Sequence, residues 1–315
     1  MKNIDCIIDT SIFGWQEKAS KNLDTLGVTV LRNITNNETI QKINSDAKDI
    51  LSKRSMSGLH GYIQKDPFKK MFDGFLVSSE VIKILANQEL IKLAKNYLED
   101  DILITECFFK HDLGNNSVYF PYHRHTGSDL FYTDDKNKFG CGIILYLHDT
   151  DSGAFCYLPG SHKYAIRNKK EFLLSESKEY RHLKSEISRI NGQAGDLVIF
   201  NEAGYHGPEQ PVINTRSVII SGFQSKKMSQ NKTRTEIPIL LSNLNSLNEE
   251  QLSVIGFGSG SRSNYQSYHM RKKNNSFYYN FINSLLDLIF KLQRLKHKIN
   301  FRNNLNKFLN KDFKT

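Results

Sequence analysis

The chain has 315 residues and a mass of 36.3 kDa, and 39% of its residues are hydrophobic and 11% aromatic. This composition excludes an intrinsically disordered chain and predicts a folded globular protein with a sizeable core. The formal net charge of +10 produces a positive field that favours anionic partners without identifying them.

The four cysteines lie far apart in the sequence and include no C-x-x-C pair. They therefore predict neither a structural zinc site nor a disulfide framework. Acidic residues interrupt the apolar stretch at the start of the chain, so it does not resemble a signal peptide. No run approaches the roughly 18 apolar residues of a membrane span. We expect a cytoplasmic protein.

Residues 1–100 are predicted to be mainly helical and to support the rest of the fold. The segment Thr35–Glu38 is a capping-box pattern, and apolar residues follow it at helical spacing. A second helical stretch runs from about Ser79 to Leu98, and Asn87 is the position at which it would divide into two helices.

The pattern changes period in residues 101–225, where short β-branched or aromatic runs are separated by Gly, Pro, Asn and Asp. Because helices do not alternate with these runs, the pattern favours an antiparallel sandwich or barrel. A polar, partly helical insert at 165–190 interrupts the series. The runs are 102–110, 117–123, 141–149, 153–160, 195–200 and 216–223.

The sequence beyond the strands has two parts. Residues 226–276 are polar and contain the stretch 256–264, which is typical of a flexible linker or exposed loop. In residues 277–315, apolar residues recur at helical spacing among many Lys and Arg, which predicts a basic amphipathic helical tail. Two interpretations stay open: the tail lies on an anionic membrane surface, peripherally, or it packs on the barrel or a partner subunit. Nucleic acid is not expected as a partner, because the strand region lacks interleaved basic residues.

Three histidines are candidates for a metal site. His123 ends one strand-like run and His125 follows two residues later. Residues i and i+2 of an extended segment face the same side, so both imidazoles can point at one ion. His206 follows another strand-like run further along the chain. A close pair plus one distant ligand is a way for a β-barrel to hold iron and leave other positions open. The alternative is that these are scattered surface or hydrogen-bonded histidines.

Arg216 lies inside the apolar run NTRSVIISGF. Burying an unpaired guanidinium is very costly, so Arg216 needs an anion, and its planar fork suits a carboxylate. Two partners stay open: the far carboxylate of a bound 2-oxo diacid, or an acidic side chain in a structural salt bridge on an edge strand.

The order YHRHT (122–126), GIILYLHDTDSGAFCYLPGSHK (142–163), GDLVIF with the distant His206, and then Arg216 resembles the phytanoyl-CoA dioxygenase family of iron and 2-oxoglutarate oxygenases. The resemblance implies a mainly β fold with flanking helices around a double-stranded β-helix, also called a jelly-roll or cupin-like core. It implies Fe(II), 2-oxoglutarate and O₂, with hydroxylation of a substrate C–H bond. It also implies that His123 and His206 bind the metal, that Arg216 binds 2-oxoglutarate, and that His162 belongs to a structural turn.

The sequence departs from the family at His125, where the family pattern has a carboxylate. Three explanations stay open. His125 is itself a ligand in a three-histidine centre, without the negative charge that helps to balance Fe(II). Alternatively, the register slips and the segment 125–127 resembles the carboxylate-free site of the iron halogenases. In the third, Asp129 supplies the carboxylate or the metal is absent.

These alternatives define three hypotheses for function. The first is an Fe(II)- and 2-oxoglutarate-dependent hydroxylase of a small or lipid-linked organic molecule. The second is a jelly-roll binding protein that has lost catalysis, and the third is a halogenase. Substrate specificity is expected to reside in segments 52–76 and 164–192, because loops carry specificity in such folds.

Overall fold

The structure is a computed structural model, and some parts of the predicted organisation lie outside the residues that it describes. These parts are the tail at 277–315, most of the predicted loop sequence at 256–264, most of segment 52–76, and Asp129. The described residues are 4–52, 68–71, 74–112, 114, 121–125, 138–164, 172–209, 213–226 and 244–256.

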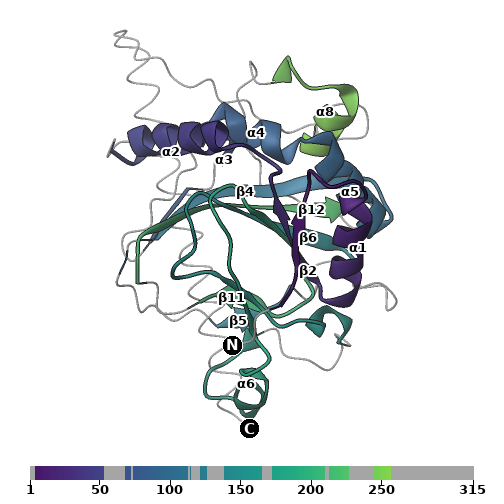
Figure 1. Ribbon diagram of the computed structural model, residues 1–315, viewed down its shortest axis with the longest axis vertical. Helices are drawn as coiled ribbons and strands as arrows, with labels where there is room; N and C mark the ends of the chain where they lie inside the picture. Colours follow the sequence, from purple (N-terminus) through teal and green to yellow (C-terminus); the bar gives the residue numbers. More distant parts are fainter. Residues whose placement is uncertain are drawn as a thin grey trace, which may run out of the picture.

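The described strands form two sheets that face each other (Figure 1). The seven-stranded sheet contains β1 (Ile7–Asp9), β2 (Val28–Arg32), β3 (Phe68–Met71), β4 (Ile102–Asp112), β6 (Gly140–Tyr146), β10 (Leu197–Asn201) and β12 (Arg216–Ser225). The five-stranded sheet contains β5 (Tyr122–His123), β7 (Phe155–Tyr157), β8 (Phe172–Leu173), β9 (Ser188–Ile190) and β11 (His206–Pro208). Their orders are β1-β2-β10-β6-β12-β4-β3 and β8-β5-β11-β7-β9. Apart from the parallel pair β1 and β2, the paired strands are antiparallel, which confirms the predicted mainly β, jelly-roll type of core.

The central strands of the larger sheet are buried on both faces. Along β6, Ile143 and Leu145 belong to a cluster shared with the helices, whereas Ile144 and Tyr146 belong to a cluster between the two sheets. Side chains alternate between the faces of a strand, so a strand covered on both faces becomes apolar throughout. This burial explains the unbroken apolar run that the sequence shows at β6.

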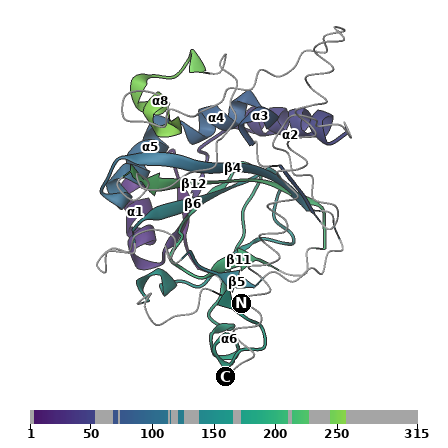
Figure 2. The same ribbon diagram turned by 180° about the vertical axis from the view of Figure 1, so that it is seen from behind.

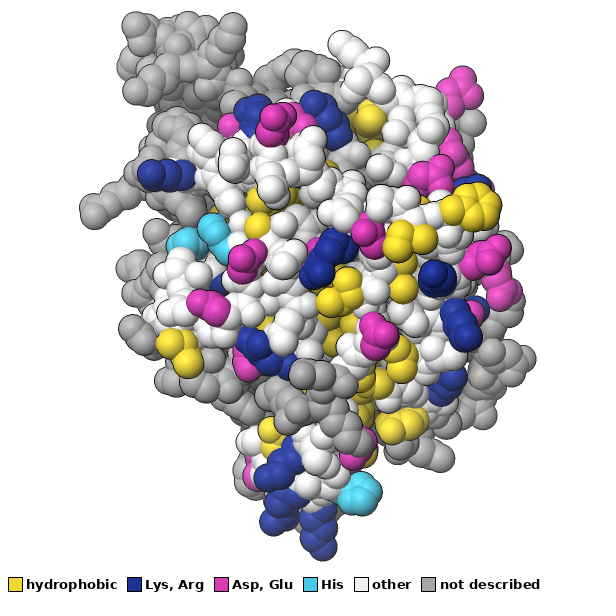
Figure 3. All heavy atoms as spheres, in the orientation of Figure 1, with side chains coloured by type: hydrophobic (Ala, Val, Ile, Leu, Met, Phe, Trp, Pro, Cys, Tyr) yellow, Lys and Arg dark blue, Asp and Glu magenta, His cyan; other side chains and the backbone are white. Residues whose placement is uncertain are grey.

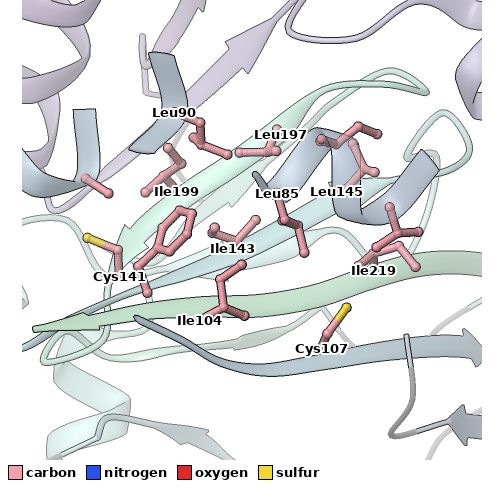
Figure 4. Close-up of a cluster of buried hydrophobic side chains, with 14 of the residues drawn as sticks. Leu85, Leu90, Ile104, Cys107, Cys141, Ile143, Leu145, Leu197, Ile199 and Ile219 are labelled. Carbon is pink, nitrogen blue, oxygen red and sulfur yellow. The ribbon is translucent and has the colours of Figure 1, made fainter. Parts of the chain in front are cut away.

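Helices cover the face of the larger sheet that points away from β5 and β11 (Figures 1 and 2). They are α1 (Trp15–Thr25), α2 (Asn37–Ser52), α3 (Gly74–Val77), α4 (Ser79–Leu85), α5 (Gln88–Leu98) and α8 (Glu249–Ile255). Figure 4 shows how Leu85 and Leu90 of the helices meet Ile143, Leu145 and Ile199 of the sheet. The packed helices thereby stiffen the sheet that carries β10 and β12.

The helix boundaries test two predictions. The predicted division at Asn87 is confirmed, because its Oδ1 accepts hydrogen bonds from the backbone N–H groups of Glu89 and Leu90, at 2.9 and 3.3 Å, as the N-cap of α5. The cap predicted at Thr35 lies one residue later. Asn36 Oδ1 accepts the Thr39 N–H at 2.9 Å, which agrees with the equal or greater preference of Asn for this position.

The prediction that residues 1–100 are mainly helical missed three strands. β1, β2 and β3 lie in this region, and β2 pairs with β10 deep in the larger sheet. β2 has only five residues and lies between two helices, so its alternation of apolar and polar side chains is too short to stand out in the sequence.

The predicted polar loop region 226–276 also contains a helix. Asn248 and Gln251 form a capping box for α8, whose Val254 and Ile255 are buried. A helix this short depends on tertiary packing rather than on its own propensity, so two apolar anchors gave no clear helical period. Within the predicted insert at 165–190, α6 (Lys178–Leu183) confirms the partly helical interpretation.

The face of the molecule in Figure 3 has little of the one-sided charge that the net charge suggests. On the face in Figure 3, Lys and Arg are interspersed with Asp and Glu, except at the tip formed by α6, where basic side chains gather. Lys178, Arg181 and Lys184 are exposed there. No helix among the described residues is long and apolar enough to cross a membrane.

We expect replacement of Ile199 by Ala to lower the free energy of unfolding by about 2–5 kcal/mol, because this side chain is only 1% exposed between sheet and helices. The matched control is Ile12→Ala, at a site that is 51% exposed, for which we expect a change within about 0.5 kcal/mol. Urea unfolding followed by circular dichroism measures both. Equal losses would contradict the assignment of Ile199 to the core.

Candidate metal centre

The structure brings His123, His125 and His206 together, although two segments far apart in sequence supply them. His123 ends β5 and His206 begins β11, and the two residues are register partners across the antiparallel pair. Their ring centroids lie 4.4 Å apart, and the His125 ring lies 5.5 Å from His123 and 5.3 Å from His206. One ligand atom of each ring lies within 4.8 Å of the others, a spacing that small side-chain rotations can bring onto one ion. The three histidines are therefore not scattered over the surface.

The Nδ1 atoms of the two strand histidines face backbone oxygens. His123 Nδ1 lies 3.3 Å from Pro121 O, and His206 Nδ1 lies 2.9 Å from Gly204 O. A carbonyl oxygen only accepts hydrogen bonds, so each Nδ1 carries the proton. The lone pair of a neutral imidazole then resides on Nε2, which can serve as a ligand atom.

His125 is held in a similar way, but by a carboxylate. Its Nδ1 lies 3.4 Å from Glu202 Oε2, and its backbone N–H donates to Glu202 O at 2.8 Å. All three rings thus place an oxygen behind Nδ1. Three neutral imidazole donors suit Fe(II), among other divalent first-row metals, so this set of residues fits the implied metal.

The surroundings of the cluster keep its inner member neutral. Burial, followed by the neighbouring His123 and His125, lowers the pKa of His206 well below its usual value. A metal requires the unprotonated imidazole, so the buried ring is ready to bind. The rings of Phe200 and Phe155 pack against His206, with centroids at 4.6 and 5.9 Å. The His125 side chain, in contrast, is 43% exposed.

Arg216 faces the space between the two sheets. It lies two residues before Val218, a member of the intersheet cluster, and therefore shares its face of β12. Its Nε donates to Asp112 Oδ2 at 2.9 Å, and Lys110 Nζ lies 3.1 Å from the other oxygen of Asp112. The salt bridge that the sequence left open is therefore present, although β12 is a central strand and not an edge. Among the described residues no other hydrogen bond or ion pair reaches Arg216, so its two terminal nitrogens remain available for a carboxylate.

Other site residues divide into expected and missed. His162 lies in the turn η1 (Ser161–Lys163), where its Nε2 faces Asp24 O at 3.2 Å, so it belongs to a structural turn as expected. The sequence interpretation missed Phe155, Phe200 and Glu202. The two phenylalanines alternate with outward residues in their strands, but nothing local links Glu202 to His125.

The fold and the site define a jelly-roll protein with a histidine cluster between its sheets. Residues 23–210 match the phytanoyl-CoA dioxygenase (PhyH) family, and the chain belongs to this family. The protein is accordingly an Fe(II)- and 2-oxoglutarate-dependent dioxygenase, with Fe(II), 2-oxoglutarate and O₂ as cofactor and cosubstrates.

Three solved structures share this fold at low sequence identity. EctD from S. alaskensis with bound Fe has a TM-score of 0.54 and 15% identity, covering 72% of this chain and 83% of that one. HygX from Streptomyces hygroscopicus with nickel and 2-oxoglutarate bound has a TM-score of 0.51 and 18% identity, covering 69% and 88%. The non-haem alpha-ketoglutarate-dependent epimerase SnoN from nogalamycin biosynthesis has a TM-score of 0.52 and 13% identity, covering 67% and 81%. At these identities the likeness concerns the fold. No curated protein sequence matches the chain.

We expect His206→Ala to abolish Fe(II) binding, because it removes the buried imidazole of the cluster while the strand ladder of β11 persists. Anaerobic isothermal titration calorimetry measures the binding. The matched control is His182→Ala, at an exposed position on α6, which should bind like the wild type. Undiminished binding by the His206 variant would show that the metal is held elsewhere.

Proposed function

We propose that this dioxygenase hydroxylates a small organic substrate at a metal held by His123, His125 and His206, with Arg216 holding the far carboxylate of 2-oxoglutarate. The observation that carries the proposal is the convergence of three imidazoles, each with Nδ1 turned toward an oxygen. This common orientation is usual for metal-bound histidines, whose second ring nitrogen donates to an oxygen while the first binds the ion.

The chain's own groups would divide the work as follows. Iron and 2-oxoglutarate, when bound, supply the oxidising chemistry, with succinate and CO₂ as the products of 2-oxoglutarate. The three imidazoles would hold the metal, and the cosubstrates would bind to it beside them. Phe155 and Phe200 pack beside the buried His206 and exclude water from that side. Substrate would approach from the exposed side of His125.

The surroundings of Arg216 support a bound anion. Arg216 pairs with Asp112 through Nε in a largely buried place. Its terminal nitrogens offer a carboxylate a fork of donors. The ion pair through Nε fixes the guanidinium before the cosubstrate binds, which lowers the entropic cost of binding.

The substrate class is proposed by analogy with the solved structures. HygX has been crystallised with hygromycin B, and EctD with 5-hydroxyectoine, and both ligands are small molecules. We propose a small organic substrate for this protein too. A lipid-linked substrate belongs to this proposal only through the predicted tail at 277–315.

We expect the wild-type protein, supplied with Fe(II), O₂ and 2-oxoglutarate, to release succinate. Arg216→Lys should raise KM for 2-oxoglutarate by about tenfold or more, because a hydrogen bond to a charged group contributes about 1.5–3 kcal/mol and lysine lacks the fork. Lysine can keep the ion pair with Asp112, so the fold should persist. Arg181→Lys, on the exposed surface of α6, is the control.

Fe(II) binding, succinate release and the identity of the product together distinguish the three hypotheses for function. A wild-type protein that binds neither Fe(II) nor 2-oxoglutarate and releases no succinate would support the binding-protein alternative. A chlorinated product that appears only with added chloride would support the halogenase. An unchanged KM in Arg216→Lys would move the cosubstrate site away from Arg216 while leaving the enzyme class intact.

The tail can be tested separately from the active site. If residues 277–315 lie on an anionic membrane, their deletion should abolish cosedimentation with vesicles that contain anionic lipid. Vesicles of neutral lipid are the control, since they lack the charge that attracts Lys and Arg. Equal cosedimentation of the full-length and shortened proteins would contradict the membrane interpretation.

A further inference from the structure

Glu202 is a buried carboxylate next to His125, the proposed ligand at which the sequence departs from the family. It follows the last residue of β10, and its side chain is only 4% exposed. Its Oε2 has no hydrogen-bond partner among the described residues, and its near contact is His125 Nδ1 at 3.4 Å. A carboxylate is costly to bury unless a cation or a donor compensates its charge. The contact with His125 is therefore the first place to look for that compensation.

The fold holds Glu202 and His125 together through the backbone as well. The His125 N–H donates to Glu202 O at 2.8 Å, and the Glu202 N–H donates to Gly140 O at 3.3 Å. A Cβ atom at Gly140 would come within 2.7 Å of Glu202 Oε2, so a glycine there leaves room for the carboxylate. Glu202 thus bridges the segment after β5 and the start of β6 through backbone hydrogen bonds.

The three histidines differ in what stands behind them. Carbonyl oxygens face Nδ1 of His123 and His206, whereas a carboxylate faces Nδ1 of His125. His125 is also the position at which the resembling family has a carboxylate ligand. A carboxylate that accepts a hydrogen bond from the N–H group of a metal-bound imidazole fixes the ring and raises its basicity. The three proposed ligands carry no negative charge, but Glu202 places a carboxylate directly behind His125.

We propose that Glu202 is a positioning residue that holds His125 as a metal ligand and supplies, from behind the ring, the negative charge that a ligand carboxylate would carry. This inference rests on the proposed three-histidine centre. Direct ligation by Glu202 is a different arrangement, and the geometry disfavours it: the carboxylate lies on the Nδ1 side of His125, and the cluster of mutually close ligand atoms contains the three histidines without it.

The experiment removes the charge but not the shape. Glu202→Gln keeps the length and an acceptor oxygen, and we expect it to weaken Fe(II) affinity about 10- to 100-fold, as for other partners of metal-bound histidines. We also expect the Fe(III)/Fe(II) reduction potential of the iron-loaded protein to rise, because losing a nearby negative charge favours the less positive ion. The matched control is Glu209→Gln, whose carboxylate pairs with Arg189 at 2.8 Å instead of with a histidine. It should leave both quantities unchanged.

A double-mutant cycle tests whether Glu202 acts through His125. In a His125→Ala background, the loss of Fe(II) affinity caused by Glu202→Gln should shrink, because residues that act through each other are not additive. An equal loss in both backgrounds would overturn the proposal and favour direct ligation or a purely structural role. Unchanged affinity and potential in Glu202→Gln itself would overturn it as well.

A second variant covers the case in which Glu202→Gln does not fold. Glu202→Asp keeps the charge and should bind Fe(II) more tightly than the Gln variant if that variant folds, and more tightly than His125→Ala in any case. Weaker binding than His125→Ala would overturn the proposal. If the wild-type protein binds no Fe(II), the proposed function fails first. If it binds Fe(II) and releases succinate while the Glu202 variants match it, only the present inference fails.

Discussion

The strand register between β5 and β11 is the constraint on which the site depends. His123 and His206 are direct partners across this pair, so both rings enter the space between the sheets at the same level. A slip of one residue would turn one ring to the outer face. The strands of this sheet are short. In the facing sheet, β10 is buried on both faces, so Phe200 packs against His206 and Ile199 packs against the helices.

The long buried strands could be predicted from the sequence, whereas several of the short ones could not. Runs such as 141–149 and 216–223 are apolar because both of their faces are covered, and they appear as β6 and β12. β8, β9 and β11 span two or three residues, which is too short for any period to show. Their places are set by pairing with other strands, which depends on contacts between distant segments.

The same division applies to the site. His123 and His125 could be proposed from their spacing of two, and His206 from its place after an apolar run and from the family resemblance. The ion pair of Arg216 with Asp112 depends on the register of β12 against β4, which the sequence does not display. Glu202 could not be predicted for a similar reason, since its contact with His125 joins the end of β10 to the segment after β5.

In the proposed centre, His125 and Glu202 compensate each other. A third neutral imidazole at the metal would lack the charge that a ligand carboxylate contributes, and a buried Glu202 without a donor or cation nearby would pay a large desolvation penalty. In the proposed centre the ring carries a proton on Nδ1 for the carboxylate and a lone pair on Nε2 for the metal, so one side chain compensates both groups. The departure from the family at His125 is then a displacement of the negative charge by one imidazole rather than its loss, and a site of this kind can still balance Fe(II).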